Sequence, residues 1–193
     1  MVNNKKEESI LIGATELFSR FGYHAVGVDS IVENSNVAKM TLYKFFPSKD
    51  ILIERTLVRR SIMLQQSITA SVSKARSPMG RIKSIFDWHE KWLTNPDFNG
   101  CMFIKASEEF PDPDSPIKEA SQLHKDWMTA YLIELLNDLR IANINKIANY
   151  IVVVLEGLTV NANVYSTKKA ADLRFSWKCI KQLIESNQKP MIV

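Results

Sequence analysis

The 193-residue sequence contains few residues that interrupt helices, with only six glycines and seven prolines. Glycine weakens helices through its backbone freedom, and proline lacks the amide hydrogen that a helix interior requires. Most of the prolines fall between residues 78 and 116. Long stretches without either residue therefore predict an all-α chain of the ordinary globular class, since the composition is 46% hydrophobic and 24% charged.

The usual motifs of metal binding and catalysis are also missing. Cys101 and Cys179 match no zinc or redox spacing, so we expect reduced thiols. The three histidines show no HExxH spacing, and the sequence has neither a glycine-rich phosphate loop nor a GxSxG elbow. We therefore expect no enzyme, no catalytic residues, no metal site and no cofactor.

No uninterrupted apolar run reaches the roughly 18 residues that a membrane span needs. The most apolar stretch, residues 147–158, is interrupted by Asn149 and Glu156. The N-terminal MVNNKKEESI carries charges of both signs and lacks the apolar segment of a signal peptide. The net charge of +4 is a mild basic bias, which supports nucleic-acid binding only weakly. We expect a cytoplasmic protein without a membrane partner.

Residues 28–49, VDSIVENSNVAKMTLYKFFPSK, carry the most specific pattern in the chain. Apolar residues recur at helical spacing, the segment NSN at 34–36 breaks the pattern, and a second short helix follows. Pro47 cannot continue that helix, and Ser48 can cap the next one. Helix, short turn and helix is the layout of a helix-turn-helix element, whose second helix enters the DNA major groove.

Seven further helices bring the expected total to about nine. Residues 5–21 form an amphipathic first helix, which Gly22 can end in the left-handed conformation. Its apolar stripe consists of Ile10, Ala14, Leu17, Phe18 and Phe21. A long helix follows at about 48–73, with a buried side expected at Ile51, Leu52, Thr56, Leu57, Ile62 and Leu64. The remaining helices are expected at about 79–94, 101–110, 116–139, 143–165 and 168–187.

The N-terminal quarter of the chain resembles the TetR family of bacterial one-component transcription regulators. The matching residues are Leu17, Phe18, Phe21, Gly22, Tyr23, Ile31, Val37, Thr41, Leu42, Tyr43, Phe46, Pro47, Ser48, Lys49 and Leu52. We expect a three-helix DNA-binding domain over residues 1–47 and a helical domain over 48–193. The resemblance implies that the second domain binds a ligand and forms the dimer.

The second helix of the helix-turn-helix must turn one face to the domain core and the other to DNA. If it begins near Ala38, Leu42 and either Phe45 or Phe46 pack inward. The residues left for the outer face are Lys39, Met40, Thr41, Tyr43 and Lys44.

The resemblance gives several of these residues a role. In similar proteins the positions of Tyr43 and Lys49 contact phosphates, and those of Lys39, Met40 and Lys44 lie near bases or backbone. Phosphate contacts position a protein on DNA, whereas base contacts give specificity. For Tyr43, a place in the core is the alternative.

Four positions depart from the family pattern. Asn36 stands where glycine is usual, although asparagine also tolerates a positive φ. Ala38 replaces the serine that caps the second helix, at a cost of about 1 kcal/mol. Met40 replaces a small residue, and Gly27 replaces a capping serine or threonine. The base preference therefore does not follow from the resemblance.

Geometry predicts a homodimer, because one short helix reads too few base pairs to select a site in a genome. Two copies on a two-fold axis require a near-palindromic double-stranded operator. The helices at 143–165 and 168–187 are apolar enough to pair with their symmetry mates as a four-helix bundle. A place of 143–165 in the chain's own core is the alternative.

Residues 79–135 are rich in aromatic side chains and methionine. An apolar pocket with a few polar anchors is the usual form of a small-molecule site, although an aromatic stripe also suits plain core. Glu108 and Glu109 would favour a cationic ligand if they are not simply exposed. The candidate pocket residues are Phe86, His89, Trp92, Phe103, Phe110, Trp127 and Tyr131.

Together these patterns predict a ligand-responsive transcriptional regulator. We expect it to bind its operator as a homodimer, to act as a repressor and to be released by an unknown small-molecule effector. The alternative is a DNA-binding regulator without a ligand, whose helical domain serves only for dimerisation or a protein partner. Ligand-induced release from DNA separates the two.

Overall fold

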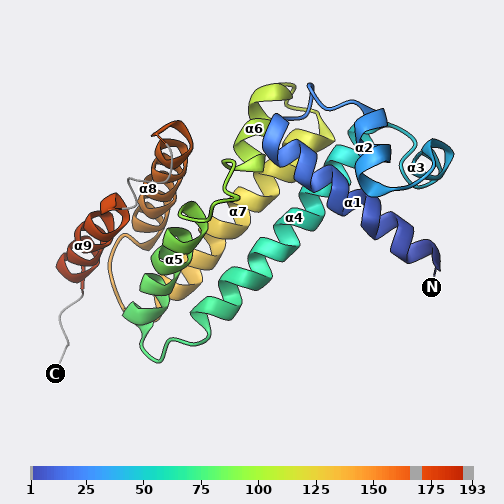
Figure 1. The fold of residues 1–193 in the computed structure, drawn as a ribbon. Helices are drawn as coiled ribbons and strands as arrows, with labels where there is room; N and C mark the ends of the chain where they lie inside the picture. Colours follow the sequence, from blue (N-terminus) through green and yellow to red (C-terminus); the bar gives the residue numbers. More distant parts are fainter. Residues whose placement is uncertain (1, 166–170, 189–193) are drawn as a thin grey trace. The chain divides into compact units, whose positions relative to one another are not determined.

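A computed structural model of the chain describes residues 2–165 and 171–188, and this part is built of α-helices (Figure 1). Their bounds are α1 Val2–Phe21, α2 Val28–Ser35, α3 Lys39–Phe45, α4 Lys49–Val72, α5 Pro78–Leu93, α6 Met102–Glu109, α7 Pro116–Asn137, α8 Ile144–Tyr165 and α9 Ala171–Ser186. The predicted all-α class is confirmed, and so are the positions of the helices. Residues 168–170 of the last predicted helix lie outside the described residues.

Local signals set several helix ends as expected. After α1 the chain turns at Gly22, where φ is +81°. Asn36 ends α2 in the left-handed conformation, with φ 53° and ψ 48°. The hydroxyl of Ser48 accepts a hydrogen bond from the Ile51 amide at 3.2 Å and so caps α4. Ser77 caps α5 in the same way, with Pro78 at the first helical position.

The chain folds into two compact units, each made of two segments. The first unit comprises Met1–Leu64 and Cys101–His124, and the second comprises Gln65–Gly100 and Lys125–Val193. The expected boundary between residues 47 and 48 separates a DNA-binding domain from a ligand-binding domain. It concerns the functions of the two parts and not their packing, so it stays a prediction. In the first unit the helix-turn-helix shares its compact body with the first half of α4, with α6 and with the start of α7.

The first unit has a core drawn from α1 to α4 and from α6. Its fully buried apolar side chains include Ile10, Ala14, Phe18, Tyr23, Ile31, Leu42, Phe46, Leu52, Ile53, Leu57 and Ala106. The expected burial of Phe21 is wrong, because its side chain is 59% exposed. The chain turns back at Gly22, so Tyr23 packs against Phe18 instead, with ring centroids 5.1 Å apart.

The expected buried side of α4 also needs a correction. Leu52, Thr56 and Leu57 are buried, but Ile51 and Ile62 are exposed. At about 100° per residue, Ile51 and Ile62 project from nearly the opposite side of the helix. Their apolar character alone did not reveal this, because the helix carries apolar residues on both faces.

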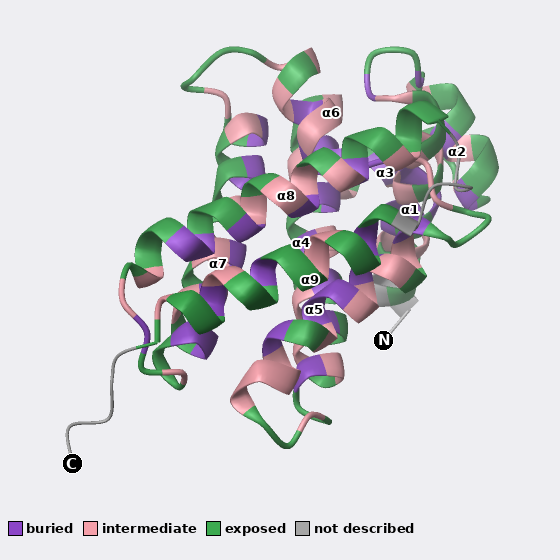
Figure 2. Ribbon diagram, turned by 90° about the vertical axis from the view of Figure 1, so that its left-hand side faces the viewer, coloured by how far each residue is buried: buried purple, intermediate pink, exposed green. Residues whose placement is uncertain are grey.

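The second unit has its own core, formed by α5, α8, α9 and parts of α4 and α7. Ile147, Ile151 and Leu155 of α8 lie fully inside it. This face of α8 therefore belongs to the chain's own core, as the alternative interpretation held. Other residues of α8 are exposed, and Figure 2 shows buried and exposed residues alternating along the helix.

The α8 helix overturns one expectation about apolar runs. It has 22 residues, and an 18-residue window within it has a mean hydropathy of 1.4, so by length and composition it could cross a membrane. Its many isoleucine, valine and leucine residues outweigh the interruptions at Asn149 and Glu156. Glu156 forms an ion pair with Lys125 at 2.7 Å. One such helix is weak evidence for a membrane protein, because core helices pass the same test.

Candidate nucleic-acid interface

The α3 helix is held by apolar side chains on its inner face. Leu42 is completely buried and Phe46, directly after the helix, is 1% exposed. Phe45 is half-buried, with its ring centroid 6.4 Å from that of Phe46. Of the two phenylalanines considered for the core, Phe46 therefore takes the deeper position.

The six residues predicted to contact DNA come together on α3 and at the first position of α4. Lys39, Met40, Tyr43 and Lys44 are exposed, with exposed fractions of 81% for Met40 and 39% for Tyr43. Thr41 and Lys49 are half-buried. Tyr43 is thus not part of the buried core. The arrangement leaves cationic, aromatic and thioether groups on one accessible face, and their contacts with DNA stay a prediction.

Two of the lysines are positioned by partners within the unit. The Lys39 ammonium lies 2.7 Å from a carboxylate oxygen of Asp29 in the first turn of α2. The hydrogen bond to Asp29, together with its negative charge, raises the pKa of Lys39 above its ordinary value. The Lys49 ammonium donates to the backbone carbonyl oxygen of His24 at 3.5 Å.

The turn between α2 and α3 follows the expected geometry. The amide of Asn36 donates to the Glu33 carbonyl at 3.2 Å, and the left-handed backbone of Asn36 redirects the chain. The N-terminal caps of the two helices are weak, because Gly27 before α2 and Ala38 before α3 make no side-chain hydrogen bond to them. The hydroxyl of Ser9 joins α1 to this turn through a 2.9 Å hydrogen bond to the Ser35 carbonyl, a contact that no motif in the sequence indicates.

The candidate pocket residues fall into both units, and each has aromatic neighbours of its own. In the first unit, Phe103 stacks on His124 with ring centroids 3.8 Å apart. Phe110 lies against Tyr23 and His24. Phe103 is buried core, so its assignment to a ligand cavity stays a prediction.

In the second unit the other candidates make separate ring contacts. Phe86 packs on Trp177 at 5.4 Å between centroids, and Trp127 stacks on Tyr131 at 5.3 Å. His89 lies 6.0 Å from Trp92, and its Nδ1 is 2.8 Å from the Ile85 carbonyl oxygen. Burial lowers the pKa of His89 to about 4, although this backbone hydrogen bond opposes the shift.

A hollow outside the predicted pocket lies along α1. Its volume is about 730 Å³, and it is lined by Lys5, Glu8, Ser9, Ile12, Gly13, Glu16 and Asn34. None of these residues belongs to the aromatic set from 79–135. Among the described residues, no group of three or more histidine, cysteine, aspartate or glutamate side chains is placed to hold a metal ion.

Comparison with known proteins agrees with this geometry. Residues 10–56 match the sequence profile of the family described as bacterial regulatory proteins, tetR family. The chain is 24% identical over 161 residues to the HTH-type transcriptional regulator YjdC of Escherichia coli, covering 79% of this chain and 80% of that protein. It is 30% identical over 114 residues to the HTH-type transcriptional activator FasR of Mycolicibacterium smegmatis, covering 57% and 50% of the two chains.

The fold is shared with solved structures. A TetR-family transcriptional regulator from Streptomyces coelicolor superposes with a TM-score of 0.88 at 22% identity, covering 96% of this chain and 97% of that one. Reduced NemR of Escherichia coli superposes with a TM-score of 0.80 at 18% identity, covering 91% and 97%.

Proposed function

Because the chain belongs to the TetR family and is a DNA-binding transcriptional regulator, we propose that it represses transcription from a near-palindromic operator as a ligand-released homodimer. The exposed outer face of α3, above a buried inner face, is the observation that carries the proposal. TetR-family members are regulators rather than enzymes. Binding to chromosomal DNA would place the protein in the cytoplasm.

The recognition helix has a suitable size and chemistry for the major groove. An α-helix with its side chains is about 10–12 Å across, and the groove is about 12 Å wide, so α3 fits into it. Met40, in the first turn of the helix, is 81% exposed and would meet apolar groups such as thymine methyls. Lys39, Thr41 and Lys44 would approach bases or backbone, while Tyr43 and Lys49 would contact phosphates and fix the register.

We assign the homodimer contact to α8 and α9. Tyr150, Val153, Gly157, Val160 and Val164 are all exposed and follow one another at spacings of three and four residues. This spacing makes one continuous stripe along a helix. A Cβ atom added at Gly157 would meet no heavy atom within 4 Å, so the centre of the stripe is open to a second helix.

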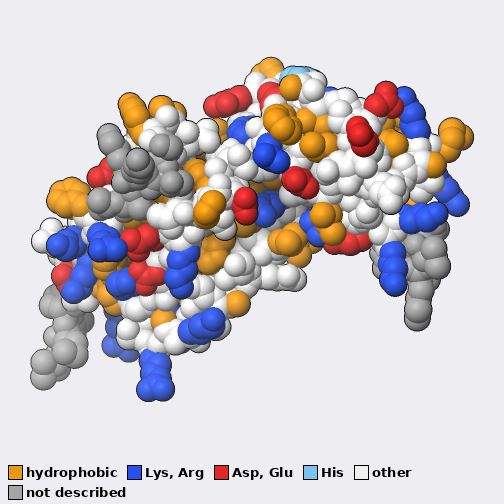
Figure 3. Space-filling model, viewed as in Figure 1, with side chains coloured by type: hydrophobic (Ala, Val, Ile, Leu, Met, Phe, Trp, Pro, Cys, Tyr) orange, Lys and Arg blue, Asp and Glu red, His pale blue; other side chains and the backbone are white. Residues whose placement is uncertain are grey.

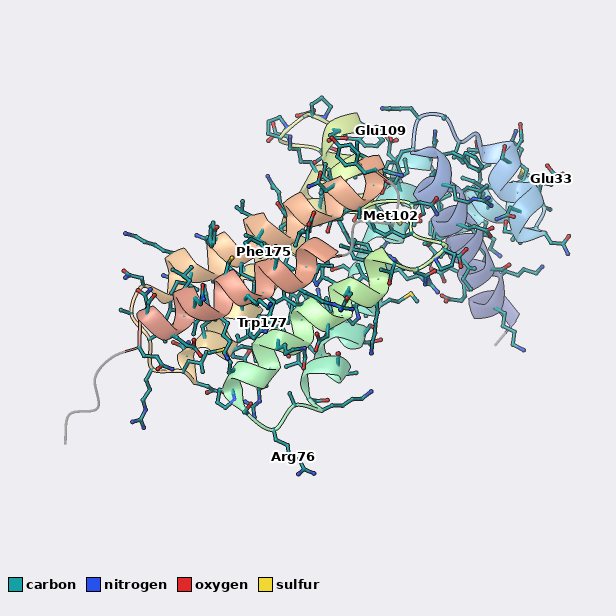
Figure 4. The ribbon with its side chains drawn as sticks, turned by 60° about the vertical axis from the view of Figure 1, so that its left-hand side comes forward. Glu33, Arg76, Met102, Glu109, Phe175 and Trp177 are labelled. Atoms are coloured by element: carbon teal, nitrogen blue, oxygen red, sulfur yellow. The ribbon has the colours of Figure 1, made fainter. Side chains whose placement is uncertain are left out.

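The α9 helix extends this apolar surface. Phe175 is 68% exposed, whereas Trp177 packs inward against Phe86, and both are labelled in Figure 4. Figure 3 shows hydrophobic side chains on the surface over α8 and α9. Pairing with a second copy would bury them as a four-helix bundle.

Release by a small molecule rests on the aromatic residues of α5, α6 and α7, with residues 48–193 as the sensing and dimerising part. Coupling between ligand and DNA typically amounts to about 1–3 kcal/mol and is reciprocal. Saturating operator should therefore weaken effector binding by the same factor. The alternative is a regulator whose helical part only dimerises or binds a protein.

Selection of bound sequences from a random duplex pool tests the proposal. We expect an enriched palindrome whose half-sites are spaced by about one helical repeat. Recovery of single half-sites would contradict the dimer, and a pool without enrichment would contradict sequence-specific binding. The selected duplex then serves to screen for small molecules that release the protein.

A further inference from the structure

The α6 helix is fastened to the connection between α1 and α2 within the first unit. After Gly22, the amide of Tyr23 donates to both carboxylate oxygens of Glu109, at 2.9 and 3.0 Å. The amide of His24 donates to one of the same oxygens at 2.6 Å. Successive amides that converge on one anion form a nest, and here the carboxylate of Glu109 fills it.

Three further hydrogen bonds join the same elements. The Tyr23 hydroxyl donates to the Met102 carbonyl at 2.8 Å, at the other end of α6 from Glu109 (Figure 4). The Lys105 ammonium donates to the Ser19 carbonyl in the last turn of α1 at 2.8 Å, where a cation suits the helix dipole. Nε2 of His24 lies 2.9 Å from the Glu109 carbonyl oxygen.

Gly22 makes this close approach possible. Its φ of +81° turns the following amides towards α6, and residues other than glycine rarely adopt this backbone conformation. A Cβ atom at this position would lie 2.7 Å from a carboxylate oxygen of Glu109. Glycine therefore suits this turn both by its backbone conformation and by the room that it leaves for the Glu109 carboxylate.

The fastened connection leads directly to the DNA-reading element. α2 begins four residues after His24, at Val28. The carbonyl of His24 also accepts the hydrogen bond from Lys49, a predicted phosphate contact. His24 is thus held by Glu109 through its amide and by Lys49 through its carbonyl.

We propose that Glu109 is a positioning residue for DNA binding, whose carboxylate fixes the α1–α2 connection and with it α2, α3 and Lys49. The inference rests on the proposed function of α3. It makes α6 a structural part of the DNA-reading unit. It also means that the Glu109 carboxylate binds backbone amides of the protein and not a cationic ligand.

The variant Glu109→Ala tests the proposal, with Glu108→Ala as its matched control. Glu108 is the neighbouring exposed glutamate, so the two variants remove the same charge. Operator affinity, measured by fluorescence anisotropy on the selected duplex, should fall roughly tenfold in Glu109→Ala, because the lost hydrogen bonds are charge-assisted. Glu108→Ala should bind like the unmodified protein.

Chemical rescue separates positioning from a general loss of stability. Formate is small enough to enter the emptied nest, so it should restore part of the affinity of Glu109→Ala. Chloride at the same ionic strength should not, and this match is essential because salt itself weakens DNA binding. Glu109→Gln keeps one oxygen acceptor and should show an intermediate affinity.

Backbone amide NMR shifts of Tyr23 and His24 give a readout that does not depend on DNA. They should change in Glu109→Ala and move back with formate, but stay constant in Glu108→Ala. Unchanged shifts in Glu109→Ala would overturn the proposal. So would equal operator affinities of a folded Glu109→Ala and the unmodified protein, or equal losses in both alanine variants.

Failure of the proposed function gives a different result. If the unmodified protein selects no duplex, α3 is not a DNA-reading helix, and the amide shifts alone then decide whether Glu109 fixes the connection. If Glu109→Ala does not fold, Glu109→Gln and its control Glu108→Gln are measured in the same way. Equal affinity and equal amide shifts in those two variants would contradict the positioning role.

Discussion

His89 links the stability of the second unit to pH. Its side chain is buried on α5, and burial lowers its pKa to about 4 from the usual 6.5. As pH falls, the unfolded chain therefore binds this proton before the folded chain does. Stability from this residue is complete above about pH 7 and is lost between pH 6.5 and 4.

We expect the free energy of unfolding to drop by about 2 kcal/mol between pH 7 and pH 5 on account of His89. Urea unfolding at the two pH values measures the drop, and the variant His89→Gln should show a smaller one. The same pH dependence in both proteins would contradict the assignment.

Lys49 is predicted to act on DNA through charge alone. Lys49→Ala should weaken binding to all duplexes alike and lower the salt slope of log affinity by about one, since one phosphate contact is lost. Titrations at several salt concentrations measure the slope. Lys74→Ala, at an exposed lysine after α4, is the matched control and should leave the slope unchanged.

Lys44 provides the contrast, because it lies on the outer face of α3. If it reads a base, Lys44→Ala should change the preference among operator variants more than the overall affinity. Competition between duplexes that differ at single positions measures this preference. Should Lys44→Ala and Lys49→Ala both leave DNA binding intact, α3 is not the recognition helix.

At the scale of elements, the weak start of α3 can be improved. Ala38 occupies the N-cap with φ −73° and ψ 144°, a conformation that suits a capping serine, but it makes no side-chain hydrogen bond. Ala38→Ser should raise the free energy of unfolding by about 1 kcal/mol. Chemical unfolding measures the gain, and Ala25→Ser, in the exposed α1–α2 connection, should give none.

Helices with strong local signals were predictable from the sequence. Gly22, Asn36, Pro47 and Ser48 mark helix ends because their effect lies in their own backbone or in the next turn. The predicted DNA-contacting residues also came together, since all of them belong to one short segment.

Features that depend on distant segments could not be predicted. Glu109 contacts residues 85 and 86 positions earlier in the chain, and no periodicity encodes that distance. α8 likewise carries apolar residues on two faces, and the sequence alone did not separate core from exposed surface.

The whole molecule is expected to act as a pair. Val153 lies within the exposed stripe of α8 and is 64% exposed in the single chain. Val153→Glu should place two charges in the dimer contact and yield monomers, which bind the palindrome far more weakly because each reads only one half-site.

Sedimentation measures the mass of this variant, and the operator titration measures its affinity. Val58→Glu makes the same substitution at an exposed valine of α4 and should remain dimeric. A dimeric Val153→Glu would place the contact elsewhere.

The order of segments in the first unit has a consequence during translation. Its N-terminal segment leaves the ribosome first, but Glu109 belongs to the second segment, Cys101–His124. Synthesis of the intervening residues 65–100 takes roughly 2–7 s at the usual rate of about 5–20 residues per second. Until then the Glu109 carboxylate is not available to the amides of Tyr23 and His24, so the proposed role of Glu109 predicts that the DNA-reading element of a nascent chain is fixed in place only after α6 has been synthesised.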